Sequence, residues 1–156
     1  RVSGKLSLVF NPRIWENAIV VLGEDSIVRG DTSKTITRMV LGAGAKEVHW
    51  IIGLPQVTHP CHLGVSMRAN EELIAWSKNG DPKKIAREIG ATSVNYISHV
   101  GFIRARLKSG KDLVIPANEK EIFLANGGCG GCLTGLHPVS QEGVIYKRKD
   151  AMSISV

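Results

Sequence analysis

The segment Ala18–Ser33, AIVVLGEDSIVRGDTS, constrains the fold more than any other part of this sequence. It begins with five consecutive apolar residues, Ala18–Leu22, which are typical of a strand in a parallel sheet covered on both faces. Two adjacent acids, Glu24 and Asp25, follow, and a short polar loop leads at once into a helical pattern. A strand, a loop and a helix in this order predict the first half of a βαβ unit.

Apolar spacing predicts the second half of this unit. Residues recur at helical intervals after the loop: Ile36, Met39, Val40 and Ala43. We expect Thr32 or Ser33 to cap this helix and Gly44 to lie just past its end. Val48–Ile52 is then the next strand, parallel to the first.

The rest of the chain shows weaker patterns. Leu54–Ala69 has no hydrophobic period and is expected to be a long loop, and Gly127–Cys132 a glycine-rich turn. The other expected elements are a strand over Leu6–Phe10, a helix from Asn70 to about Lys78, a helix from Asp81-Pro82 to Gly90, a strand over Ser93–Ile97, and a helix with Val100, Ile103 and Leu107 on one face. The expected class is α/β, with a partial parallel-sheet domain over residues 1–110 and an irregular C-terminal extension over 111–156.

Composition limits the partners. A hydrophobic content of 43% fits a folded globular chain. No apolar run approaches the ~20 residues of a membrane span and no signal peptide is seen, so we expect a cytoplasmic protein with no membrane partner. The net charge of +6 has one dense run, Lys147–Lys149, without interleaved aromatic residues, which argues against nucleic-acid binding. Arg1 in place of Met indicates a fragment or a processed chain.

The residues after the first strand suit a phosphorylated sugar. Glu24 and Asp25 offer acceptors for ribose hydroxyls and for Mg²⁺, and the loop amides and helix N-terminus suit a phosphate. Arg29 is a candidate bidentate phosphate donor, and Gly30 lets the backbone approach a ligand closely. The spacing excludes a P-loop and a dinucleotide-binding fingerprint.

The segment Glu24–Thr32 resembles the phosphoribosyl diphosphate (PRPP) loop of type I phosphoribosyltransferases, most closely that of the amidophosphoribosyltransferases. Further segments resemble this family in the same order: Phe10–Pro12, Gly42–His49, Pro60–Val65, Glu71–Ala75, Ile89–Val94 and Cys132–Gly135. The resemblance implies a partial type I phosphoribosyltransferase-like fold. It also implies the PRPP-binding part of an enzyme that makes phosphoribosylamine from PRPP and glutamine-derived ammonia in de novo purine synthesis.

By this resemblance, Glu24 and Asp25 hold the ribose hydroxyls and Mg²⁺. The residues expected to cradle the 5′-phosphate are Ser26, Ile27, Val28, Arg29, Gly30, Asp31 and Thr32. Gly23 and Asp31 depart from the family's pattern, and a carboxylate at Asp31 repels phosphate unless it turns outward.

No catalytic residue is identified. The resemblance implies a diphosphate-binding loop upstream, a glutaminase domain upstream or in a separate chain, and a homo-oligomer. The alternatives are a truncated, non-catalytic ribose-phosphate or Fe–S binding module, or another type I phosphoribosyltransferase.

Three cysteines exclude a complete internal disulfide framework, and Cys129 and Cys132 form a C-x-x-C motif. By the resemblance, Cys61, Cys129 and Cys132 are three ligands of a [4Fe–4S] cluster whose fourth ligand lies outside this chain. Zinc is the lesser alternative, with the three cysteines and one of His59, His62 or His137. A redox dithiol and inert buried thiols remain open.

Overall fold

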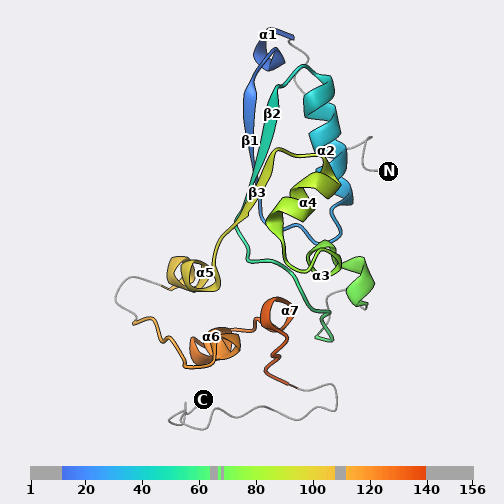
Figure 1. The fold of residues 1–156 in the computed structure, drawn as a ribbon. Helices are drawn as coiled ribbons and strands as arrows, with labels where there is room; N and C mark the ends of the chain where they lie inside the picture. Colours follow the sequence, from blue (N-terminus) through green and yellow to red (C-terminus); the bar gives the residue numbers. More distant parts are fainter. Residues whose placement is uncertain (1–11, 64–66, 68, 108–111, 140–156) are drawn as a thin grey trace.

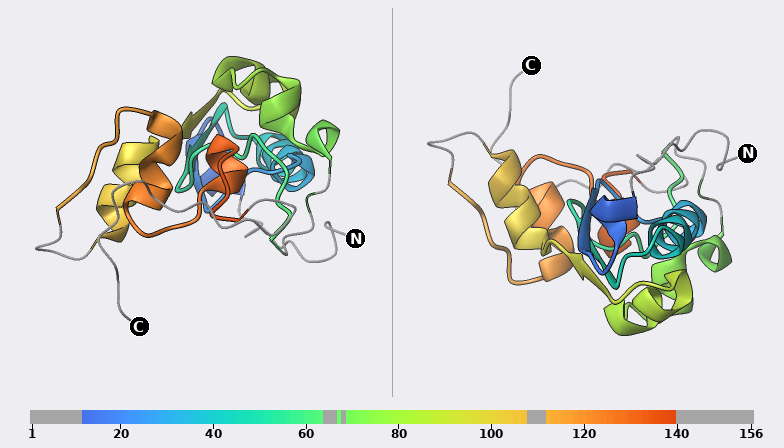
Figure 2. Two further views of the ribbon diagram at one scale, coloured as in Figure 1. Left: turned by 90° about the horizontal axis from the view of Figure 1, so that it is seen from below. Right: turned by 90° about the horizontal axis from the view of Figure 1, so that it is seen from above.

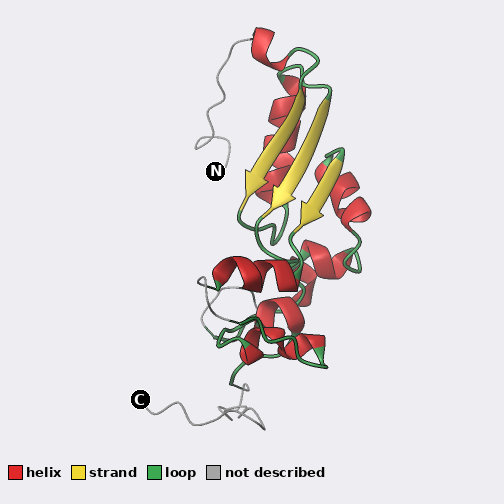
Figure 3. Ribbon diagram, turned by 90° about the vertical axis from the view of Figure 1, so that its left-hand side faces the viewer, coloured by secondary structure: helices red, strands yellow, loops and turns green. Residues whose placement is uncertain are grey.

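The structure, a computed structural model, describes residues 12–63, 67, 69–107 and 112–139 (Figure 1). Its sheet has three parallel strands in sequence order: β1 (Ile19–Glu24), β2 (Glu47–Ile52) and β3 (Ser93–Tyr96). The three arrows in Figure 3 point the same way, so the carboxyl ends of the strands lie at one end of the sheet. The α/β class and these three predicted strands are confirmed. The strand predicted over Leu6–Phe10 and the basic run Lys147–Lys149 lie outside the described residues.

Two helices cover one face of the sheet. α2 (Asp31–Gly42) connects β1 to β2, and α4 (Pro82–Ile89) precedes β3. Figures 1 and 2 show both on the same side of the strands. As predicted, Asp81 caps α4 by accepting hydrogen bonds from two N–H groups of the first turn, and Gly90 ends it. None of the described helices is long and apolar enough to cross a membrane.

The start of α2 differs from the prediction. The sequence favours Thr32 or Ser33 as the cap, but α2 begins at Asp31 and its N-cap is Gly30. Gly30 has φ 88°, a left-handed conformation that glycine adopts without strain, and this turn lets the helix begin earlier. Among the described residues no side chain caps α2, so N–H groups of its first turn remain available to a ligand. At the other end, Gly44 follows the C-cap with φ 112°, as predicted.

The helix predicted after the long loop is interrupted. A 3₁₀ turn, η2 (Asn70–Glu72), and a short helix, α3 (Ile74–Ser77), are separated by Leu73, whose backbone is extended. The cause is tertiary packing. Leu73 is fully buried, and the N–H of Ile74 donates to the C=O of Val28 (2.9 Å).

Short helices form the C-terminal part of the described chain. They are α5 (His99–Arg106), η3 (Glu119–Glu121), α6 (Ile122–Ala125) and α7 (Gly131–Thr134), while α1 (Pro12–Trp15) precedes β1. The turn predicted over Gly127–Cys132 is wrong at its end, because α7 includes Cys132. Close packing explains the glycines here: a Cβ at Gly130 would overlap the ring of Phe123, and one at Gly131 the ring of His137.

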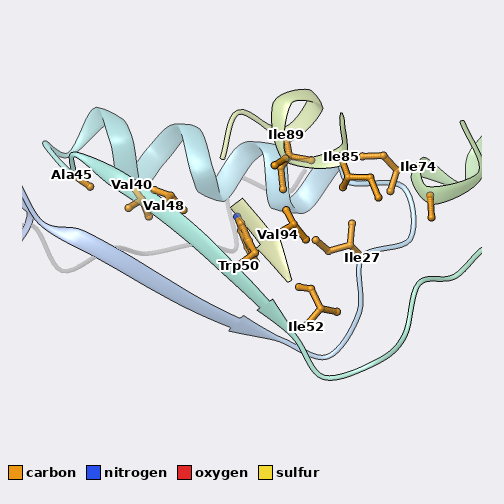
Figure 4. Packing of buried hydrophobic residues seen from close by; sticks show 12 residues of the cluster. Ile27, Val40, Ala45, Val48, Trp50, Ile52, Ile74, Ile85, Ile89 and Val94 are labelled. Atoms are coloured by element: carbon orange, nitrogen blue, oxygen red, sulfur yellow. The ribbon is translucent and has the colours of Figure 1, made fainter. Parts of the chain in front are cut away.

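The main core lies between the sheet and helices α2 and α4 (Figure 4). Its most deeply buried side chains are Val40, Val48, Trp50, Ile52, Ile85 and Ile89. Trp50 also donates its indole N–H to the hydroxyl of the buried Thr37 (2.9 Å). This hydrogen bond satisfies two polar groups that α2 and β2 would otherwise bury unpaired.

A second core joins the loop after β2 to the C-terminal helices. Its members are Val57, Met67, Leu73, Ile103, Ile122, Phe123 and Leu133. They come from both sides of the boundary predicted at residue 110, and that boundary stays a prediction.

The opposite face of the sheet is uncovered in the part of the chain that the structure describes. Ile19, Val21 and Ile51 point to this face and are 62%, 59% and 55% exposed. The expectation that both faces are covered is therefore wrong for the described residues. The reason is topological: parallel crossovers share one hand, so connections that run from β1 through β2 to β3 place their helices on one face.

Two adjacent residues of β2, Ile51 and Ile52, test whether only one face of the sheet is covered. Ile52 is 1% exposed and Ile51 is 55% exposed. We expect Ile52→Ala to lower the free energy of unfolding by about 2–5 kcal/mol. Ile51→Ala, the matched control, should change it by no more than about 0.5 kcal/mol. Urea denaturation measures both, and a comparable loss in the two variants would show that the second face is also covered.

Candidate functional site

The carboxyl end of β1 carries two acids side by side. Glu24 is the last residue of β1, and its C=O accepts a hydrogen bond from the N–H of Gly53 (2.9 Å), just after β2. Asp25 follows and accepts a hydrogen bond from the hydroxyl of Ser26 (3.2 Å). Ligands of open α/β sheets bind beyond the carboxyl ends of the strands, and β1 places both acids there.

These two carboxyl groups interact with each other. Partial burial raises the pKa of Glu24 above its ordinary value, and the adjacent Asp25 raises it further. Hydrogen bonds from Glu24 and Ser26 hold the pKa of Asp25 below its ordinary value. The two pKa values thus shift in opposite directions, as expected for neighbouring carboxyls of which the more buried one keeps its proton to a higher pH. A cation between them would offset the repulsion of the fully ionised pair.

The loop after these acids is fixed at both ends. Ile27 is 2% exposed and its side chain points into the main core (Figure 4). At the other end, a Cβ on Gly30 would lie 2.7 Å from Cδ1 of Ile74, and the φ of 88° would strain any residue other than glycine. The backbone between these two residues therefore has little freedom to move.

A cleft of about 490 Å³ opens over this loop and the first turn of α2. Its lining residues are Glu24, Ser26, Ile27, Val28, Arg29, Gly30, Asp31, Thr32, Ser33 and Met67. Every residue predicted to cradle a phosphate therefore lines one cleft. Asp25 is not among the lining residues but adjoins two of them in the chain. The uncapped first turn of α2 gives the cleft the partial positive charge and the N–H groups that bind anions.

Two lining residues were not predicted. Ser33 is buried in the first turn of α2, and the sequence suggested it only as a helix cap. Its place in the cleft follows from the earlier start of α2. Met67 comes from the loop after β2 and is also buried. No local sequence pattern marks its approach, because it depends on how the two cores meet.

The guanidinium of Arg29 contacts a carboxylate. It forms an ion pair and a hydrogen bond with Glu72, the last residue of η2. This contact raises the pKa of Arg29, and the nearby Asp31 raises it further. The sequence suggested Arg29 as a phosphate donor, and in the structure Glu72 engages its guanidinium.

The three cysteines gather at α7. Cys61, Cys129 and Cys132 are all free thiols. Burial raises the pKa of Cys132, and the proximity of Cys61 and Cys129 raises it further. The N–H groups of Thr58 and His59 both donate to the C=O of Cys132 (2.9 and 3.0 Å), which fastens the loop containing Cys61 to α7.

Histidines lie beside the same segments. The rings of His62 and His137 are 4.1 Å apart between centroids. His137 is 8% exposed, and its Nε2 has no hydrogen-bond partner within the described ranges. Burial lowers the pKa of His137, and His62 and His59 lower it further. Burial thus favours the neutral form of His137, whose Nε2 remains without a partner within the described ranges.

Thiols and imidazoles are the donor types that zinc ions and iron–sulfur clusters take in proteins. In the described part of the chain, no three His, Cys, Asp or Glu side chains stand close enough together to hold one metal ion. Zinc needs its donors within about 2.0–2.3 Å, whereas an iron–sulfur cluster spreads its thiolates over separate irons. Free thiols from two fastened segments are the donor type that both zinc and iron–sulfur clusters take.

A larger cleft, of about 1000 Å³, lies between α4 and β3. It contains none of the predicted site residues. The hydroxyl of Tyr96, one of its lining residues, is buried without a hydrogen-bond partner among the described residues, and burial raises the pKa of Tyr96 to about 12. Its basic residues, Lys83 and Arg87, lie on α4, which Asp81 caps.

Comparison with known proteins supports the resemblance seen in the sequence. No family model matches the chain. The amidophosphoribosyltransferase of Archaeoglobus fulgidus is 41% identical over 124 residues, which cover 80% of this chain and 24% of that protein. The human protein of the same name is 37% identical over 134 residues, covering 79% and 26%. The Bacillus subtilis protein is 35% identical over 141 residues, covering 89% and 27%. The chain spans about a quarter of the length of these curated relatives.

Solved structures agree. Glutamine PRPP amidotransferase from Bacillus subtilis, complexed with ADP and GMP, matches with a TM-score of 0.66 and 34% identity over 86% of this chain and 27% of that chain. A structure described as the allosteric regulatory enzyme of purine biosynthesis matches with a TM-score of 0.65 and 33% identity, covering 86% and 26%. By sequence and by fold, this chain is similar to about a quarter of the length of the amidophosphoribosyltransferases, and the similarity supports its correspondence to the C-terminal part of their type I phosphoribosyltransferase domain.

Proposed function

We propose that this chain supplies the PRPP-binding part of an amidophosphoribosyltransferase of de novo purine synthesis. The observation that carries the proposal is the cleft at the carboxyl end of β1, which Glu24 lines together with the uncapped first turn of α2, and which Asp25 adjoins in the chain. The proteins of this name from archaea, bacteria and animals that resemble the chain support it.

Each part of the cleft matches one group of PRPP. The backbone N–H groups of residues 26–32 and the N-terminus of α2 bind the 5′-phosphate. Glu24 and Asp25 accept hydrogen bonds from the ribose hydroxyls. They are also the residues that would hold Mg²⁺, which when bound supplies charge neutralisation to the diphosphate.

Asp31 contributes its backbone to this phosphate site rather than its side chain. It is the first residue of α2 and is exposed. A carboxylate that faces a phosphate repels it, so the side chain must point away from the ligand. Asp31 instead acts on Arg29, whose pKa it helps to raise.

The proposed reaction is displacement of diphosphate from C1 of the ribose by ammonia, which forms phosphoribosylamine. No described residue is assigned as an acid or a base, since neutral ammonia needs little help from either. The residues that grip the sugar and the phosphate fix C1 relative to the incoming ammonia. The diphosphate site and the glutaminase domain belong to other parts of the proposed enzyme, which we expect to be a cytoplasmic homo-oligomer.

The three cysteines are proposed to ligate a structural [4Fe–4S] cluster. Cys61, Cys129 and Cys132 supply three thiolates, and the fourth ligand comes from outside this chain. The fit of three nearby free thiols to a cluster supports this assignment. The cluster takes no part in the transfer of the ribose phosphate.

Asp25→Asn tests the site. The substitution removes one of the two negative charges, so we expect the affinity for ribose 5-phosphate with Mg²⁺ to fall at least about 10- to 100-fold. Isothermal calorimetry measures this affinity. Asp112→Asn, a matched change at an exposed position between α5 and α6, should leave it unaltered. Unchanged affinity in Asp25→Asn would refute the assignment.

The pH dependence of Mg²⁺-supported binding tests the carboxyl pair. Because the pKa of Glu24 is raised, this group takes up a proton at a higher pH than an ordinary glutamate as the pH falls. Binding should therefore be complete above that pKa and be lost below it, while Asp25, with its lowered pKa, stays ionised. Titrations between about pH 4 and 8 should show this loss. Glu24→Gln, which carries no charge at any pH, should bind weakly throughout and show no such transition. A midpoint below that of an ordinary glutamate would contradict the proposal.

Metal analysis tests the cluster. Protein purified without oxygen should be brown and contain about four irons and four sulfides per chain. Cys132→Ser should lower the iron content and bleach the visible absorption, since it removes one thiolate. Stoichiometric zinc without iron would contradict the cluster.

A further inference from the structure

Arg29 lies in the middle of the loop that lines the cleft, yet its guanidinium is already paired. Its partner is Glu72, which is outside the cleft lining. Asp31, two residues further along, is a second carboxylate close enough to raise the pKa of Arg29. Part of the positive charge of Arg29 is therefore already balanced, which leaves it less able to attract a phosphate.

The two segments joined by this ion pair touch at neighbouring positions as well. The C=O of Val28 accepts a hydrogen bond from the N–H of Ile74 (2.9 Å). Gly30 packs against the side chain of the same Ile74. Val28, Arg29 and Gly30 are consecutive, and each of them contacts Glu72 or Ile74. The middle of the loop therefore packs against residues 72–74.

This docking also accounts for the break between η2 and α3. The extended backbone of Leu73 frees the N–H of Ile74 from a continuous helix and lets it reach Val28. The same break places Glu72 at the end of η2, beside Arg29. An uninterrupted helix would not offer both contacts to the loop.

We propose that Glu72 is a positioning residue for the phosphate loop, and that Arg29 acts by holding this loop against η2 rather than by binding the phosphate. The proposal rests on the proposed function, because it assigns a role within the same site. The ion pair keeps the N–H groups of the loop in place before the ligand arrives, so less ordering is required on binding.

Glu72→Gln separates the two roles of Arg29. If Arg29 bound the phosphate, removal of its carboxylate partner would free the guanidinium and tighten binding. If Arg29 positions the loop, the affinity for ribose 5-phosphate with Mg²⁺ falls, by about two- to fivefold as expected for an exposed ion pair. Arg29→Gln should weaken binding by the same factor, and the double variant by no more than either single one. Loss of a direct charged contact would instead cost about 10- to 100-fold in Arg29→Gln alone.

Two further variants serve as rescue and control. The charge swap Arg29→Glu with Glu72→Arg restores the pair and should return the affinity to within about twofold of the wild type. A phosphate ligand at position 29 would not tolerate this swap. Glu71→Gln makes the same change of charge at the neighbouring exposed residue, which has no ion pair among the described residues, and should have no effect.

Hydrogen exchange of the amides of residues 27–33, measured without ligand on the full chain, gives a readout independent of the proposed function. Glu72→Gln and Arg29→Gln should accelerate this exchange by similar factors, and the charge swap should restore it. Unchanged exchange in both variants, or tighter binding in Glu72→Gln, would overturn the inference. If the wild type binds no ribose 5-phosphate but the exchange pattern holds, the proposed function fails and the positioning role stands.

Discussion

The tight turn at Gly30 is the constraint on which the cleft depends. Its positive φ brings the chain from the loop into α2 within one residue and leaves the first turn of the helix uncapped. The missing side chain also lets the loop pack against Ile74. A residue with a Cβ would both strain the backbone and push the loop away from α3. The anion-binding end of α2 and Glu24 at the end of β1 therefore line one cleft, and this arrangement depends on a single glycine.

The cleft lies where the two cores meet. Ile27 belongs to the core beneath the sheet, and its neighbour Val28 packs against the second core. Across from them, Leu73 belongs to the second core and Ile74 to the first. Alternate residues of both segments are thus anchored in different cores. The position of the loop follows from the packing of both, which explains how an exposed loop stays ordered enough to present backbone donors to a ligand.

The sequence predicts local features well and tertiary features poorly. The three strands, the cap at Asp81 and the end of α4 at Gly90 follow from residue types in neighbouring positions. The resemblance also places the residues that line the cleft. The break at Leu73, the approach of Met67 and the pairing of Arg29 with Glu72 were not predicted, because each depends on a residue distant in the sequence. The start of α2 was not predicted because Gly30 turns the chain into the helix before the expected caps. The turn predicted over Gly127–Cys132 was wrong at its end for a related reason. Gly130 and Gly131 allow close packing against Phe123 and His137 rather than forming a turn.

The uncovered face of the sheet and the open side of the cleft have one physical origin. In the described part of the chain β1 pairs only with β2, and the connections toward β3 place α2 and α4 on a single face. Ligand sites of doubly wound sheets lie where the strand order reverses, between connections that cover opposite faces. A strand on the free side of β1, with its helix over Ile19, Val21 and Ile51, would create that reversal beside Glu24 and Asp25. Such a strand and helix would therefore cover the exposed sheet face and border the cleft at the same time.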